Sequence, residues 1–182
     1  MKIFKTKFKS CFIFKPDVYK DKRGSFSEIF NKIMLEKTLR KKINFVQLNY
    51  SFSKINVLRG MHLQKPPFSQ SKLIRVIQGK ILDIIVDLRK NSKTFGKYQS
   101  FIISEKNRKQ LFIPEGFAHG FLSLENNVKV EYLCSSLYNK NSEICLLWND
   151  KKINIKWPKK KFLISKKDKS GSTFSEVLSI IK

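Results

Sequence analysis

The sequence is poor in the residue types on which several common protein chemistries depend. Its 182 residues include three cysteines, seven glycines and two histidines. Cys11, Cys134 and Cys145 form no C-x-x-C pair, so we expect reduced thiols rather than a disulfide framework. The glycines build no P-loop, no dinucleotide-binding fingerprint and no G-x-S-x-G motif. These absences argue against the common nucleotide-dependent enzymes and against serine hydrolases of the α/β type.

Long apolar runs are also missing. No uninterrupted stretch approaches the roughly 20 residues that a membrane-spanning helix needs. The first residues, Met1–Lys9, alternate lysine with apolar side chains, which is typical of a strand and lacks the continuous apolar region of a signal peptide. We therefore expect a soluble, cytoplasmic protein that has no membrane partner.

Acidic residues are scarce relative to basic ones. The chain has 38 Lys and Arg against 14 Asp and Glu, a formal net charge of +24. Such an excess is typical of proteins that bind nucleic acid. The lysines are scattered, however, and no helix-turn-helix, zinc-finger or RNA-platform pattern accompanies them. We expect no nucleic-acid partner, although the charge should attract anionic ligands.

Many short runs that alternate apolar and polar residues make up most of the chain. They are typical of strands joined by turns, as in the pair that flanks the Gln78-Gly79 turn. The expected strands are Phe45–Tyr50, Lys72–Ile77, Lys80–Leu88, Gln99–Ser104, Leu111–Ile113, Phe117–Leu124, Val128–Cys134 and Glu143–Trp148. The pattern predicts a single mainly β domain over residues 1–182, either a sandwich or a barrel.

Helices are expected only at the periphery. Residues Lys32–Leu39 have a weak apolar stripe. A helix over about 173–182 is better supported, because Thr173-x-x-Glu176 is a capping-box pattern and apolar residues recur at helical spacing after it.

Strand alternation places several polar side chains on otherwise apolar faces. His119 shares a face with Phe117 and Phe121, and alternation around Asn56–Gln64 puts His62 with Leu58 and Gly60. The full set of such groups is His62, Lys72, Asp83, His119 and Tyr132. Each alone is compatible with a satisfied core group or a strand end. Together they predict a polar cavity inside a barrel, because burying an unpaired charge is costly.

The chemistry that best fits this set is proton transfer at a carbon next to a carbonyl. Histidine is the usual base, tyrosine can act as the acid and lysine can stabilise an enolate oxygen. Two histidines and a carboxylate could also bind Fe(II) or Zn(II). Because no second histidine lies at ligand spacing from His62, we expect no metal and no cofactor.

A series of segments along the chain is similar to the dTDP-4-dehydrorhamnose 3,5-epimerase family. The likeness extends from about Asp21 to Asp168, and no single motif carries it. The matching segments are Asp21–Glu28, Gln47–Ser51, Leu58–Gln64, Gln70–Leu73, Asp87–Arg89, Ser92–Gly96, Pro114–Phe121, Trp148–Asp150 and Ile155–Pro158. The resemblance implies a cupin-type double-stranded β-helix, or jelly-roll, barrel that forms a homodimer without a metal. It also implies dTDP-4-dehydro-6-deoxy-D-glucose as the substrate, epimerised at C3 and C5 on the route to L-rhamnose.

The resemblance assigns roles to individual positions. It implies that His62 is the catalytic base, Asp168 the carboxylate paired with it, Tyr132 the proton donor and Lys72 the lysine near the keto oxygen. Asp83 is the expected hydrogen-bond partner of His119. The expected substrate-binding residues are Arg23, Phe26, Glu28, Gln47, Asn49, Arg59, His119, Tyr138, Glu143 and Lys167. Within this set, Arg23–Glu28 is expected to reach the partner subunit's site.

The chain departs from the family pattern at several positions. Leu48 replaces an acidic residue, Leu63 replaces an aromatic residue and Ser71 stands where glycine is common. The most altered segment is Glu131–Tyr138, where a shift of register would remove Tyr132 from the donor position. Two alternatives therefore remain beside the 3,5-epimerase. One is an epimerase or ketoisomerase acting at a single position of a related sugar nucleotide, and the other is a non-enzymatic protein that binds a sugar nucleotide or a nucleic acid.

Overall fold

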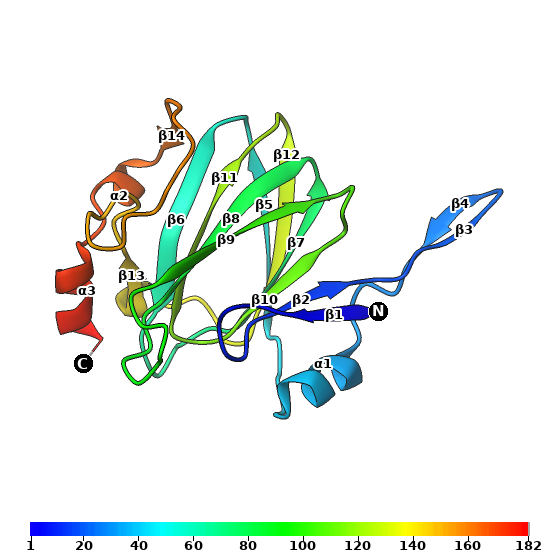
Figure 1. Cartoon of the computed structure of the whole chain (residues 1–182), viewed down its shortest axis with the longest axis horizontal. Helices are drawn as coiled ribbons and strands as arrows, with labels where there is room; N and C mark the ends of the chain where they lie inside the picture. The colour runs from blue at the N-terminus through cyan, green and yellow to red at the C-terminus, as the bar shows by residue number, and fades with distance from the viewer. Residues whose placement is uncertain (182) are drawn as a thin grey trace.

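Two antiparallel sheets form the body of the molecule, as seen in a computed structural model that describes residues 1–181 (Figure 1). The first sheet has the strand order β1–β2–β10–β7–β12–β5, with the bounds Lys2–Lys5, Phe12–Lys15, Gln110–Ile113, Lys72–Gln78, Val128–Cys134 and Gln47–Ser53. The second has the order β13–β6–β11–β8–β9, with the bounds Glu143–Cys145, Val57–Gln64, Phe117–Ser123, Lys80–Asp87 and Tyr98–Ser104. The chain passes repeatedly from one sheet to the other, which gives the expected jelly-roll barrel.

Smaller elements flank the barrel. Strand β14, Leu163–Ile164, pairs with β6 in the parallel direction, and β3, Tyr19–Asp21, forms a separate hairpin with β4, Gly24–Phe26. The helices are α1 at Lys32–Leu39, α2 at Lys166–Lys169 and α3 at Phe174–Ile180, with one 3₁₀ turn at Lys140–Ser142. No helix within residues 1–181 combines the length and apolar character needed to cross a bilayer.

Three apolar clusters hold these layers together. The largest fills the barrel between the sheets and includes Ile74, Ile85, Leu111 and Val130. A second lies on the outer face of the second sheet, where the C-terminal segment covers it with residues such as Val177. In the third, α1 packs on the outer face of the first sheet. Alternation along each strand sends every second side chain to one of these clusters.

Most of the predicted elements are confirmed. The Gln78-Gly79 turn joins β7 to β8, and Gly79 has the positive φ of 81° that this reversal requires. The capping box is also present, because the Thr173 side chain accepts from the Glu176 N–H while Glu176 accepts from the Thr173 N–H. Lys182, the end of the predicted C-terminal helix, lies outside the described residues.

Other elements differ from the expectation. The strand predicted over Glu143–Trp148 ends at Cys145. Leu146 still exchanges two backbone hydrogen bonds with Met61 and forms an isolated bridge with Ser172. The β3–β4 hairpin and helix α2 were not predicted. Helix α2 has four residues, too few for an apolar stripe to repeat, so periodicity gives no signal for it.

One prediction about side-chain direction is wrong. In the register between β6 and β11, His62 lies opposite His119 and Arg59 lies opposite Phe121, with a shift between the two pairs. His62 therefore shares its face with Arg59, whereas Leu58 pairs with Leu122 on the other face. At the shift, Gly60 has a φ of 122°, and a Cβ there would lie 2.5 Å from the Gly120 Cα. An irregularity of this kind re-aims a side chain, which strict alternation cannot anticipate.

Leu111→Ala is expected to lower the free energy of unfolding by about 2–5 kcal/mol, because it leaves a cavity in the barrel core. Leu111 is fully buried on β10, between β2 and β7. Urea unfolding followed by circular dichroism measures the change. Ile33→Ala is the matched control, because Ile33 is 80% exposed on α1 and should cost less than about 1 kcal/mol. Equal losses in the two variants would contradict this description of the core.

Candidate active site

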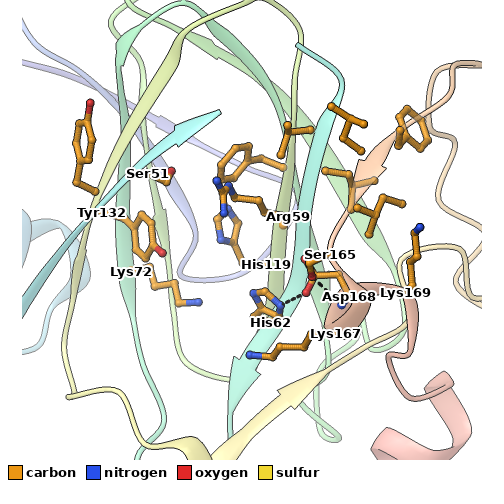
Figure 2. Close-up of a pocket in the computed structure, with 18 of the residues that line it drawn as sticks. Ser51, Arg59, His62, Lys72, His119, Tyr132, Ser165, Lys167, Asp168 and Lys169 are labelled. Carbon is orange, nitrogen blue, oxygen red and sulfur yellow. Dashed lines mark hydrogen bonds and ion pairs between the residues drawn. The ribbon is translucent and has the colours of Figure 1, made fainter. Parts of the chain in front are cut away.

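A cavity of about 710 Å³ opens between the two sheets, and residues from both sheets line it (Figure 2). The second sheet contributes Arg59 and His62 from β6 and His119 from β11. The first sheet contributes Lys72 from β7 and Tyr132 from β12. The predicted polar cavity is therefore present, with its histidines on one wall and its lysine and tyrosine on the other.

His62 and Asp168 form a hydrogen-bonded pair at the edge of this cavity. The His62 Nε2 lies 2.7 Å from the Asp168 Oδ1 (Figure 2). Asp168 belongs to helix α2, where the Ser165 hydroxyl accepts from its backbone N–H, and its Oδ2 accepts from the Gly60 N–H at 3.3 Å. The short helix thus presents a carboxylate to an imidazole that lies 106 residues away in the sequence.

The electrostatics of the pair set the roles of the two imidazole nitrogens. Burial would raise the pKa of Asp168, but the hydrogen bond and charge of His62, with the Gly60 and Ser165 contacts, bring that pKa below its usual range. The carboxylate is therefore ionised at neutral pH and accepts a hydrogen bond from the Nε2–H of the imidazole in its neutral form. The Nδ1 atom is then left without a hydrogen and is available as a base.

On the opposite wall, burial keeps an ammonium and a phenol poorly solvated. Burial lowers the pKa of Lys72, which is 9% exposed. Burial also raises the pKa of Tyr132, so this phenol stays protonated at neutral pH. Within residues 1–181, burial and the more distant Cys134, Asp83 and Glu143 influence the Lys72 pKa, and no side-chain hydrogen bond contributes to it. A ligand oxygen placed beside the Lys72 ammonium would satisfy it.

His119 is supported from behind by a buried carboxylate, as predicted for Asp83. The His119 Nε2 lies 2.8 Å from the Asp83 Oδ2. Asp83 is fully buried, and burial raises its pKa although the neighbouring His119 acts in the opposite direction. Its second oxygen, Oδ1, has no hydrogen-bond partner among the described residues. Asp83 does not line the cavity itself, so its contact with the cavity passes through His119.

The cavity is rich in positive charge. The Arg59 guanidinium donates to the Ser53 hydroxyl at 3.0 Å and to the Phe52 carbonyl at 2.9 Å, and both acceptors are neutral. Lys161, Lys167 and Lys169 also line the cavity, from the segment around α2. These cations favour an anionic ligand, and the fork of an arginine suits phosphate oxygens.

Two further groups of predicted residues lie beside the cavity as small networks. Glu143 accepts from the Tyr138 hydroxyl at 2.7 Å and from the Lys167 ammonium at 2.5 Å. Gln47 donates to Asn49 at 2.8 Å and accepts from the Tyr138 N–H at 2.8 Å. The networks connect β5, β13 and α2 through the segment after β12. Gln47, Asn49, Tyr138 and Glu143 therefore lie beside the cavity without lining it.

Three other predicted residues lie far from this cavity. Arg23 lies in the β3–β4 turn, Phe26 ends β4 and is 69% exposed, and Glu28 follows it on the surface. The hairpin projects away from the barrel on the side remote from β6 and α2 (Figure 1). These three side chains therefore cannot contact a ligand that is bound in the cavity of their own chain.

The chain matches known proteins over almost its whole length. Residues 5–176 match the family model of dTDP-4-dehydrorhamnose 3,5-epimerase. The epimerase of Shigella flexneri is 44% identical over 174 residues, which cover 96% of this chain and 96% of that protein. The chain belongs to the dTDP-4-dehydrorhamnose 3,5-epimerase family. It is thus a member of a family of isomerases, and its jelly-roll barrel is the cupin-type fold expected of that family.

Solved structures of the family agree with this assignment. The dTDP-4-dehydrorhamnose 3,5-epimerase of Elizabethkingia anophelis NUHP1 is 40% identical and superposes with a TM-score of 0.93, covering 97% of each chain. The dTDP-6-deoxy-D-glucose-3,5-epimerase of Legionella pneumophila is 36% identical, with a TM-score of 0.91 over 100% of this chain and 94% of that one. The latter structure holds dTDP-4-keto-L-rhamnose.

The departures from the epimerase pattern leave the cavity intact. Leu48 points outward from β5 and is 59% exposed, and Leu63 packs in the cluster on the outer face of the second sheet. In the altered segment, β12 keeps continuous pairing with β5 from Val130 to Cys134, so Tyr132 lies opposite Asn49 and faces inward. Tyr132 therefore keeps an inward-facing place, while its role as the proton donor stays a prediction.

Sequence reasoning missed one residue that lines the cavity and one that lies behind the His62–Asp168 pair. Ser51 lines the cavity from β5, and its hydroxyl is buried without a hydrogen-bond partner among residues 1–181. Cys145 lies opposite His62 in the ladder between β13 and β6, and its Sγ is 3.9 Å from the Asp168 Oδ1. Burial and the nearby Asp168 raise the pKa of this thiol to about 12. The strand containing Cys145 was predicted, but its pairing partner is not encoded in any local pattern.

His62, Cys145 and Asp168 also form a cluster of metal-ligand types. One ligand atom from each lies within 4.8 Å of the others. Histidine spacing along the chain gives no sign of this cluster, because Cys145 and Asp168 lie far from His62 in the sequence.

Proposed function

We propose that this protein epimerises C3 and C5 of dTDP-4-dehydro-6-deoxy-D-glucose to give dTDP-4-dehydro-L-rhamnose, as a cofactor-independent isomerase of dTDP-rhamnose biosynthesis. The observation that carries the proposal is the hydrogen-bonded His62–Asp168 pair on one wall of a cavity whose other wall holds Lys72 and Tyr132. Family membership and the dTDP-sugar bound by a relative support the choice of substrate. The same proposal takes residues 1–182 as one cupin-like domain of a cytoplasmic protein.

Proton removal is the task of His62. The 4-keto group of the sugar acidifies the hydrogens on C3 and C5, and the free Nδ1 takes one of them while Asp168 stabilises the imidazolium that forms. The negative charge moves to the keto oxygen as the enolate develops. Lys72 donates to that oxygen.

Proton return is the task of Tyr132, and the opposed walls explain inversion. Because His62 and Tyr132 lie on facing sheets, a proton leaves one face of the sugar ring and another arrives at the opposite face. The raised pKa of Tyr132 keeps its proton in place until the enolate needs it. Solvent reprotonates the phenol and deprotonates the imidazole after each inversion.

The rest of the cavity holds the nucleotide and the sugar. Arg59 binds the diphosphate, and Lys167 adds charge at the rim. His119, supported by Asp83, donates to a sugar oxygen. Gln47, Asn49, Tyr138 and Glu143 bind further polar atoms of the substrate from the two networks beside the cavity.

Deuterium uptake tests this function. In D₂O, mass spectrometry and NMR of dTDP-4-dehydro-6-deoxyglucose incubated with the protein should show deuterium at both C3 and C5. Incorporation at one carbon only would replace the 3,5-epimerase with a single-site epimerase, and a displaced carbonyl would indicate a ketoisomerase. Binding of the sugar nucleotide without any exchange would overturn the proposal of an enzyme.

Tyr132→Phe is expected to separate exchange from inversion. The variant retains His62, which still removes a proton and returns a solvent-derived one to the same face, so deuterium should enter without a change of configuration. Formation of the epimerised product should fall by about 100-fold or more, because no positioned acid remains on the opposite face. NMR of the recovered sugar nucleotide measures both quantities. Loss of exchange and inversion in equal proportion would contradict the assignment of Tyr132 as the acid.

We also propose that the protein is a homodimer in which Arg23, Phe26 and Glu28 complete the partner subunit's site. The exposure of Phe26 on a projecting hairpin supports this arrangement, as does the row of exposed apolar side chains Leu48, Tyr50 and Phe52 along the edge strand β5. Subunit mixing is the test, because Arg23→Ala and His62→Ala chains share one intact site in a mixed dimer. Recovery of activity on mixing is expected, and its absence in a dimer shown to have exchanged subunits would exclude a shared site.

A further inference from the structure

We propose that His62, Cys145 and Asp168 form an inhibitory binding site for a thiophilic divalent cation, with Zn²⁺ as the representative ion. The site would share two residues with the proposed catalytic pair, so cation and substrate turnover would exclude each other. Cys145 has no part in the proposed proton transfers, and it brings a sulfur ligand to the pair.

The geometry favours a three-ligand site. One ligand atom each from His62, Cys145 and Asp168 lies within 4.8 Å of the other two. The His62 Nε2 is 2.7 Å from the Asp168 Oδ1, and the Cys145 Sγ is 3.9 Å from that same oxygen. In tetrahedral zinc sites, ligand atoms about 2.0–2.3 Å from the ion lie roughly 3.3–3.8 Å apart. Small side-chain rotations of about 1 Å or less therefore bring the three donors into place.

The backbone fixes these donors from three directions. His62 and Cys145 lie directly opposite each other on β6 and β13, where neighbouring side chains on one face approach closely. Asp168 is held by the Ser165 cap of α2 and by the Gly60 N–H. A site on two paired strands and a capped helix is preorganised, which lowers the entropy lost when an ion binds.

The cluster is also reachable and leaves room for a fourth ligand. The His62 side chain is 29% exposed and lines the cavity together with Asp168. A water molecule or a substrate oxygen in the cavity would complete the tetrahedron, as in zinc sites with three protein ligands. Cys11 and Cys134 belong to no comparable cluster. Within residues 1–181, His62, Cys145 and Asp168 are the one group of three metal-ligand side chains at this spacing.

Zn²⁺ binding would inactivate His62 as a base by fixing the imidazole in the tautomer that carries its hydrogen on Nδ1. Zn²⁺ on the His62 Nε2 displaces the hydrogen from that atom, and the neutral imidazole then carries its hydrogen on Nδ1. The Cys145 thiol gives up its proton to solvent and binds as thiolate. No oxidant or reductant takes part, and the enzyme loses the free nitrogen that would accept the substrate hydrogen.

Direct binding is the first test, and it does not depend on the proposed activity. The full chain is treated with EDTA, dialysed, and titrated with Zn²⁺ alone in the absence of sugar nucleotide. One ion per chain is expected, and Cys145→Ala should weaken its binding by at least about 10-fold. Co²⁺ should give thiolate-to-metal charge-transfer absorption that Cys145→Ala abolishes. Cys11→Ala, which removes a buried thiol remote from any such cluster, is the matched control and should bind like the wild type.

Inhibition is the second test and rests on the proposed epimerase activity. Zn²⁺ should suppress deuterium uptake by the wild type and by Cys11→Ala, with recovery on adding EDTA, whereas Cys145→Ala should need at least about 10-fold more Zn²⁺. Equal Zn²⁺ affinity in the wild type and Cys145→Ala would overturn the site, whatever the activity. A wild type that binds Zn²⁺ through Cys145 but exchanges protons normally would show that the cation does not disable His62.

Discussion

His62→Ala is expected to lower the rate of deuterium uptake at both C3 and C5 by at least about 100-fold, the usual scale for losing a positioned general base. One imidazole is the proposed base for both carbons, so the two exchange rates should fall together. Truncation at Cβ leaves Asp168 without its partner but retains Lys72 and Tyr132 on the opposite wall. The variant should therefore bind the sugar nucleotide and fail to enolise it.

Chemical rescue sharpens this prediction. The shortened side chain leaves a space in a wall of the cavity, and added imidazole should restore part of the exchange if the missing function is a base. The binding of dTDP, measured by calorimetry, serves as the control and should change by less than a few fold. Wild-type exchange in His62→Ala would remove this residue from the mechanism. Loss of exchange at one carbon only would require a second base for the other.

Asp168→Asn is expected to lower turnover by about 100-fold or more while leaving the volume of the side chain almost unchanged. The carboxylate holds Nε2 as the donor, which leaves Nδ1 free. An amide can present its NH₂ group to Nε2 and so favour the tautomer in which Nδ1 carries the hydrogen, and it cannot balance the charge of an imidazolium. The loss should appear mainly in kcat, because Asp168 does not bind the substrate in the proposed mechanism.

Ser165→Ala separates this effect from a disturbance of helix α2. The Ser165 hydroxyl caps the helix at the Asp168 N–H but makes no contact with His62. Its loss should cost about 1 kcal/mol or less of local stability and only a few fold in rate. If the capping variant lost as much activity as Asp168→Asn, the role of Asp168 would be structural and the pairing with His62 incidental.

Local sequence patterns determine much of this fold. Alternating runs such as Val128–Cys134 predict their strands because a pleated strand repeats every two residues, whatever sheet it joins. Gly79 predicts its turn because few other residues adopt a positive φ at low cost. The capping box at Thr173 predicts a helix start because its partners lie three residues apart. The resemblance to the epimerase family adds Asp168, for which periodicity gives no signal.

The arrangement of the cavity required the tertiary structure. Strand alternation placed His62 with Leu58, but the shift of register at Gly60 turns it to the side of Arg59. The approach of Cys145 to Asp168 depends on β13 pairing with β6 and on α2 packing beside it.

The difference between what could and could not be predicted comes from the sequence separation of the interacting residues. Turns, caps and alternation arise from interactions between residues a few positions apart, so the sequence alone determined them, together with the set of polar groups that face inward. Which of those groups meet across the barrel depends on long-range pairing and on irregularities in the ladder. The tertiary structure alone decided that an imidazole and a carboxylate 106 residues apart face a phenol and an ammonium from the other sheet.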